Sequence, residues 1–157
     1  MIKDSGDRRE FETGAVRDIQ EGKGRCDLMP LDIADTLLRT MSARDDQVLI
    51  YIELFKESHK PTFLEDAFRE FVRQYYPNPE TALLEVSIHF FEGSKKYGPY
   101  NWQKGIPVSS YIDSAVRHYL KHRRGDKDEP HDRAFVWNMM CCLLTINHKP
   151  ELIDLPA

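Results

Sequence analysis

Two patches of acidic and histidine side chains lie in the second half of the chain, with members spaced three or four residues apart. On a helix this spacing brings side chains to one face, and facing helices with such pairs can hold divalent ions in a bundle core. Carboxylates suit magnesium or manganese, and histidine favours manganese or cobalt. The candidate metal ligands are Glu85, His89 and Glu92 in the first patch and Asp128, Glu129 and Asp132, around His131, in the second. Solvated helix faces are the other interpretation, and both stay open.

Cationic, polar and aromatic side chains lie between the patches and in the glycine-rich N-terminal segment. Lysine and arginine can neutralise phosphate, tryptophan can stack on a base, and asparagine can bond a base edge. Each type also has a structural interpretation, as a surface charge, a loop anchor or a polar helix face. The N-terminal glycines lack phosphate-loop spacing, but this segment could still close over a ligand or a neighbouring subunit. The candidate substrate-binding residues are Lys23, Arg25, Lys95, Lys96, Asn101, Trp102, Arg117, His118 and Lys121.

The overall composition excludes several classes of protein. A length of 157 residues fits one domain with a real core. The net charge of −4 argues against a general nucleic-acid binder. No apolar run approaches the roughly 20 residues that span a bilayer, and the first residues do not resemble a signal peptide. Three cysteines, two of them the adjacent pair Cys141 and Cys142 in an apolar run, fit core packing and a reducing cytoplasm.

Residues 1–30 differ from the rest because they hold four glycines, many charges and few apolar side chains. We expect an irregular arm there, and one helical catalytic domain over residues 31–157. Apolar residues from position 31 onward recur at steps of three and four, and no run alternates as a strand would. The fold class is therefore all-α, a helical bundle. Residues 44–46 either interrupt or extend the first helix.

Helix boundary signals support this division into elements. A small polar residue before a helix can cap it, proline suits the first helical position, and glycine suits the end. The predicted starts are the capping box Thr62–Glu65, Asn78 before Pro79, Ser109 or Ser110, and Asp128 or Glu129 before Pro130; the predicted ends are Gly98 and Gly125.

A series of motifs in a fixed order resembles the phage dATP/dGTP diphosphohydrolase family, which is similar to the all-α MazG-type nucleotide pyrophosphohydrolases. The resemblance implies a MazG-like bundle that hydrolyses dGTP or dATP to the monophosphate and pyrophosphate with a divalent metal. It further implies a dimer or tetramer in the host cytoplasm, and supply of dGMP in phages that replace adenine by 2-aminoadenine. The motifs are Thr13–Asp18, Gly22–Pro30, His89–Trp102, Gly105–Pro107, Asp113–His118, Asp126–His131 and Trp137-Asn138.

The resemblance also assigns roles and shows two departures. MazG-type enzymes carry an ExxE pair and an ExxD pair; Glu129 to Asp132 fits ExxD, whereas the first patch has no strict ExxE. Residues 43–76 are longer than the family's usual segment, and we interpret them as a helical insertion or an oligomer contact. A metal-activated water would attack the α-phosphorus. The candidate catalytic residues are Glu85, Glu92 and Glu129.

Three other functions remain open from the sequence. The adjacent pair His131-Asp132 is compatible with an HD-type phosphohydrolase, with His89, His118 and Asp154 as further ligands. A non-catalytic nucleotide-binding helical protein is a second alternative, and a nucleic-acid-binding protein, disfavoured by charge, is a third. Neither the preference between dGTP and dATP nor the metal follows from the sequence.

Overall fold

The computed structural model describes residues 4–42 and 46–156, and this part of the chain is mainly helical. The all-α prediction is confirmed. The predicted break or extension at Arg44 and Asp45 lies outside the described residues. The α-helices are α1 (Leu31–Met41), α2 (Val48–Ser58), α3 (Pro61–Tyr75), α4 (Pro79–Tyr97), α5 (Val108–Arg124) and α6 (His131–His148); short 3-10 turns η1 (Cys26–Leu28), η2 (Asn101–Lys104) and η3 (Pro150–Leu152) link or follow them.

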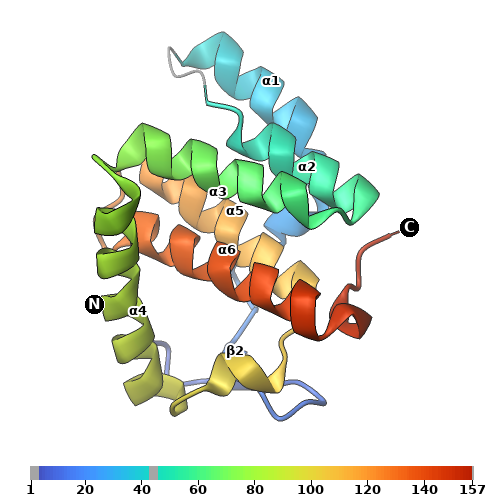
Figure 1. The fold of residues 1–157 in the computed structure, drawn as a ribbon, viewed down its shortest axis with the longest axis vertical. Coiled ribbons are helices and arrows are strands. Elements are labelled where there is room, and N and C mark those ends of the chain that lie inside the picture. The colour runs from blue at the N-terminus through green and yellow to red at the C-terminus, as the bar shows by residue number, and fades with distance from the viewer. Residues whose placement is uncertain (1–3, 43–45, 157) are drawn as a thin grey trace.

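Helices α5 and α6 run side by side through the middle of the molecule (Figure 1). Helix α3 packs beside α6, α2 and α1 follow on the same side, and α4 crosses α6 at the other side (Figure 1). Large apolar side chains fill the space between these helices, because each helix buries the face that carries its three- and four-residue repeat. Aromatic rings dominate the centre, and the ring centroids of Phe71 and Phe135 are 4.1 Å apart.

Three predicted helix boundaries are confirmed, and each has a physical cause in its own residues. Asn78 caps α4 by accepting a hydrogen bond from the backbone N–H of Thr81 at 2.8 Å, and Pro79 takes the first helical position. Gly98 ends α4, and Gly125 ends α5 in the left-handed region at φ 88°.

Three predicted starts are wrong. Helix α6 begins at His131 with Pro130 as its cap residue, so neither Asp128 nor Glu129 caps it. The capping box at Thr62 is absent, because Pro61 already takes the first position of α3 and Lys60 becomes the cap residue. Helix α5 begins at Val108, before Ser109 and Ser110, with Pro107 as its cap residue.

The N-terminal arm holds structure that its composition does not predict. Strands β1 (Arg8–Glu10) and β2 (Val16–Asp18) form an antiparallel hairpin, and Ala15 beside β2 is fully buried. Three-residue strands are too short to show alternation, so the pairing depends on contacts with distant residues. The Asn101 side chain supplies such a contact, since its amide bonds the backbone N–H and C=O of Val16 at 2.9 and 2.8 Å.

Gly105 holds the segment after η2 close to the C-terminal turn. Its φ is +109°, and a Cβ there would lie 2.7 Å from Leu152 Cδ1. Its carbonyl accepts a hydrogen bond from the Thr13 hydroxyl, so the arm is tied to the helices here as well. Only glycine combines this backbone conformation with this approach.

The cysteines and the helix lengths agree with the composition. Cys141 and Cys142 are buried in α6, as predicted, and burial raises the pKa of both thiols. All three cysteines are free thiols. Among the described residues, no helix has the length and apolar character required to cross a membrane.

Candidate active site

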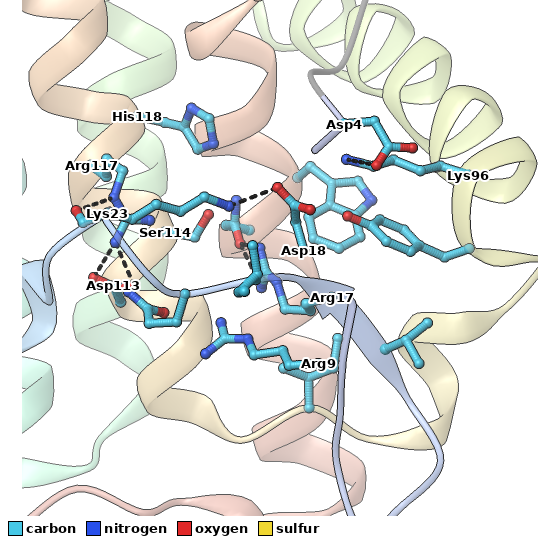
Figure 2. A pocket seen from close by; sticks show the side chains of 18 of the residues that line it. Asp4, Arg9, Arg17, Asp18, Lys23, Lys96, Asp113, Ser114, Arg117 and His118 are labelled. Atoms are coloured by element: carbon cyan, nitrogen blue, oxygen red, sulfur yellow. Dashed lines mark hydrogen bonds and ion pairs between the residues drawn. The ribbon is translucent and has the colours of Figure 1, made fainter. Parts of the chain in front are cut away.

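A cavity of about 580 Å³ lies between the arm, α4, α5 and α6 (Figure 2). This volume is in the usual range for a small-molecule site. Cations outnumber carboxylates on its walls, although the whole chain is acidic. A low-dielectric cavity with this balance attracts polyanions. The lining cations are Arg9, Arg17, Lys23, Lys96, Arg117 and Lys121, and the lining acids are Asp4, Asp18, Asp113 and Glu129.

One end of the cavity carries a cluster of metal-ligand type. His118 Nδ1 lies 2.9 Å from His131 Nδ1 and 3.7 Å from Glu129 Oε1, and one ligand atom from each residue falls within 4.8 Å of the others. Asp128 Oδ1 lies 2.6 Å from His131 Nε2. An ionised carboxylate can only accept, so this contact places a proton on His131 Nε2.

This cluster fits a divalent metal in its donor chemistry. Burial, followed by the charge of His131, lowers the pKa of His118 well below its usual value, which favours the neutral imidazole that a metal needs. A carboxylate behind one histidine is the usual arrangement for orienting a ligating imidazole. A second set, Asp126, Asp128 and His131, overlaps the first, but neither aspartate lines the cavity.

The first acidic patch takes a different form from the one that its spacing predicts. Glu92 forms an ion pair with Arg133 at 2.9 Å, and Glu85 is exposed. His89 is buried against Trp137, and burial, with the charge of Arg133, lowers its pKa to about 3. These three side chains form no metal-type cluster among the described residues.

The second patch divides between two locations. Glu129 lies in the cluster, and Asp128 lies behind His131. Asp132, three residues after Glu129, instead accepts a hydrogen bond from the Tyr76 hydroxyl at 3.2 Å. Burial and then the charge of Asp132 raise the pKa of Tyr76, so this phenol stays protonated as the donor. The structure therefore brings together the ExxD glutamate and two histidines rather than four carboxylates.

Six of the nine candidate substrate-binding residues line the cavity: Lys23, Lys96, Asn101, Arg117, His118 and Lys121. The other three lie elsewhere. Lys95 Nζ is over the Phe91 ring at 4.1 Å, Trp102 packs edge-on against Phe90, and Arg25 bonds both oxygens of Asp27 at 2.7 Å.

Arg117 and Asn101 line the cavity with their polar groups already engaged. Asp113 accepts from Arg117 at 2.6 Å through both oxygens, and the carbonyls of Lys23 and Gly24 accept from the same guanidinium at 3.2 to 3.3 Å (Figure 2). Arg117 therefore holds the arm loop against α5. The Asn101 amide likewise bonds the backbone of β2 through both its oxygen and its nitrogen, so it is unsuited to bonding a base edge.

Two arginines of the hairpin are cavity residues outside the predicted set. Arg17 belongs to a motif that carried the family resemblance, so a signal existed for it. No sequence signal marks Arg9, because its place on the wall depends on the register of β1 with β2. Both side chains project from the hairpin into the cavity (Figure 2).

A cation-lined cavity beside a histidine and carboxylate cluster is the kind of site that a phosphoryl-group hydrolase uses. A sequence model of the family described as dATP/dGTP diphosphohydrolase, N-terminal, matches residues 70–155, more than half of the chain. The chain belongs to this family, and it is an enzyme of the diphosphohydrolase class. The match covers α4 to α6 but not the arm. No curated protein and no solved structure matches the chain.

Proposed function

We propose that this protein hydrolyses dGTP or dATP to the nucleoside monophosphate and pyrophosphate, with a divalent metal held by His118, Glu129 and His131. The observation that carries the proposal is the convergence of these three side chains, of which His118 and Glu129 line the cation-lined cavity and His131 lies 2.9 Å from His118. When bound, the metal supplies a Lewis acid that lowers the pKa of water and neutralises phosphoryl charge. Asp128 fixes the ring of His131 through its Nε2 proton.

The remaining groups bind the substrate and hold its charge. Glu129 lines the cavity, so its carboxylate can orient the attacking water or accept its proton. Lys121 lies three residues after His118, where its ammonium can reach a phosphate beside the cluster. Lys23 and Lys96 have carboxylate partners in Asp18 and Asp4, which a phosphate group would replace (Figure 2).

The test is a panel of the eight common NTPs and dNTPs with Mg²⁺, Mn²⁺ or Co²⁺, with the phosphate product identified. We expect pyrophosphate from dGTP or dATP, and higher activity with Mn²⁺ or Co²⁺ than with Mg²⁺, because two ligands are histidine nitrogens. Release of tripolyphosphate would instead support an HD-type reaction. The contact of Asp132 with Tyr76, outside the cluster, argues against that reaction.

We further propose the biological role that the family resemblance implies, which is the supply of dGMP for 2-aminoadenine nucleotide synthesis in a phage-infected cytoplasm. The panel bears on this role directly. A preference for dGTP supports it, and a preference for dATP contradicts it.

We also propose that the enzyme is a homo-oligomer. Helix α4 carries an apolar stripe at i, i+4 and i+7, where Leu84, Ile88 and Phe91 are 71%, 43% and 58% exposed. A contiguous exposed stripe of large apolar side chains is typical of a protein interface. Light scattering after size exclusion should give a dimer or tetramer, and Ile88→Lys should shift it to monomer. A monomeric wild-type protein would contradict the proposal.

A further inference from the structure

The hairpin register places two arginines directly opposite each other. Arg9 of β1 pairs with Arg17 of β2, so their side chains share one face of the hairpin, and both line the cavity. Like charges directly opposite across two strands are destabilising unless something compensates them. An anion bound between the two guanidinium groups would do so.

Neither arginine forms an ion pair with a carboxylate within the described residues. Both terminal nitrogens of Arg17 donate to the neutral amide oxygen of Asn138 at 3.3 Å, and its guanidinium lies over the rings of Tyr111 and Trp137 at 5.5 and 5.7 Å. Arg9 Nε is buried and has no hydrogen-bond partner. Burial and then the charge of Arg17 lower the pKa of Arg9, and the charge of Asp113 does not offset them.

Three of the other cavity cations differ in this respect. Lys23 lies 2.9 Å from Asp18, Lys96 lies 4.0 Å from Asp4, and Arg117 is bonded by Asp113. Lys121 resembles the arginines, since no carboxylate pairs with it among the described residues, but it lies on α5, after His118. The unbalanced charge on the arm side of the cavity therefore belongs to Arg9 and Arg17.

Arg17 is held in place before any ligand binds, and the strand pairing sets Arg9 opposite it. The Asn138 side-chain amide donates to the Ala134 carbonyl at 2.8 Å, which turns its oxygen toward Arg17. The Asn101 amide holds the backbone at Val16, next to Arg17, through two hydrogen bonds. A planar donor held as Arg17 is loses little entropy on binding a polyanion.

We propose that Arg9 and Arg17 together bind the β- and γ-phosphates of the substrate and thus the departing pyrophosphate. This inference rests on the proposed function. A nucleoside triphosphate carries most of its negative charge on these two groups, and guanidinium groups bond phosphate oxygens in pairs. The α-phosphate then lies toward His118 and Glu129, where hydrolysis would occur.

Product inhibition tests this assignment, because pyrophosphate and dGMP report on different parts of the site. In Arg9→Gln and Arg17→Gln we expect pyrophosphate to inhibit dGTP hydrolysis roughly tenfold more weakly, with KM raised by a similar factor and inhibition by dGMP unchanged. Arg17→Lys should restore part of the effect. Arg69→Gln, an exposed arginine of α3 that pairs with Asp66, is the matched control and should change neither inhibition constant.

Two results would overturn the inference. One is unchanged pyrophosphate inhibition in both variants, and the other is an equal loss for pyrophosphate and dGMP, which would indicate a general disturbance of the arm. If the wild-type enzyme does not release pyrophosphate, the proposed function fails, but calorimetric binding of inorganic pyrophosphate to wild type, Arg9→Gln and Arg69→Gln still tests the arginine pair. Thermal melts establish that each variant folds.

Discussion

The two ends of the cavity differ in how far apart in the sequence the residues that form and position them lie. The helical end consists of His118, Glu129 and His131, which lie within 14 residues of one another and inside the span of the family match. The arm end consists of Arg9 and Arg17, and their position depends on Asn101 and Asn138, more than 80 residues further along the chain. The candidate metal ligands thus come from neighbouring segments, α5 and the start of α6, whereas contacts across more than 80 residues position the candidate phosphate-binding charge. Mutations at the two ends should therefore affect different kinetic constants.

The largest effect is expected at the helical end. Glu129→Gln removes the cluster's carboxylate charge but keeps its size, so kcat should fall at least about 100-fold while the melting temperature changes little. Pyrophosphate release under saturating dGTP measures this change. A fall in kcat/KM caused by KM alone would place Glu129 among the substrate-binding groups and remove the contrast with the arm.

Asp128→Asn should have the next largest effect, since it weakens the contact that orients His131. We expect the Mn²⁺ concentration for half-maximal activity to rise roughly 10- to 100-fold. Asp126→Asn is the matched control, because Asp126 bonds Arg124 at the protein surface. An equal effect of both substitutions would indicate that the metal binds to the second set, formed by Asp126, Asp128 and His131.

Asn101→Ala should separate the arm end from the helical end. It removes two hydrogen bonds to Val16, which should lower the free energy of unfolding by about 1–2 kcal/mol and raise KM more than it lowers kcat. Asn78→Ala is the control, because loss of the α4 cap costs about 1 kcal/mol and should leave KM unchanged. Equal KM values for the two variants would contradict a role of the arm in binding.

The smallest effect on the kinetic constants is expected at His89, which lines the cavity, and the test there is the pH dependence of stability. The pKa of His89 is lowered from 6.5 to about 3, so between these values the unfolded chain binds more protons than the folded one. Stability should therefore be complete above pH 6.5 and fall as the pH drops toward 3. Thermal melts from pH 7 to pH 4 should show a smaller loss in His89→Leu than in wild type. An identical loss would mean that His89 titrates normally.

Local signals in the sequence were sufficient for most of the fold. Asn78, Pro79 and Gly98 act through their own backbone and side chains, so the bounds of α4 could be predicted. Thr62 shows the limit, because the neighbouring Pro61 took the position that the capping box required. The hairpin could not be predicted, since its two strands are only three residues long and the Asn101 amide that holds β2 comes from far along the chain.

The sequence by itself determined the helical class, the family and the residue types of the site. Helical spacing determines which side chains share one face of a helix, but it does not determine which residues of other elements contact that face. Tertiary packing decided that His118 joins His131 and Glu129, while Glu92 meets Arg133 and Asp132 meets Tyr76. It also decided that Arg9 and Arg17 lie opposite each other on adjacent strands and both line the cavity. These pairings depend on how helices and the arm pack against one another, which short-range patterns do not encode.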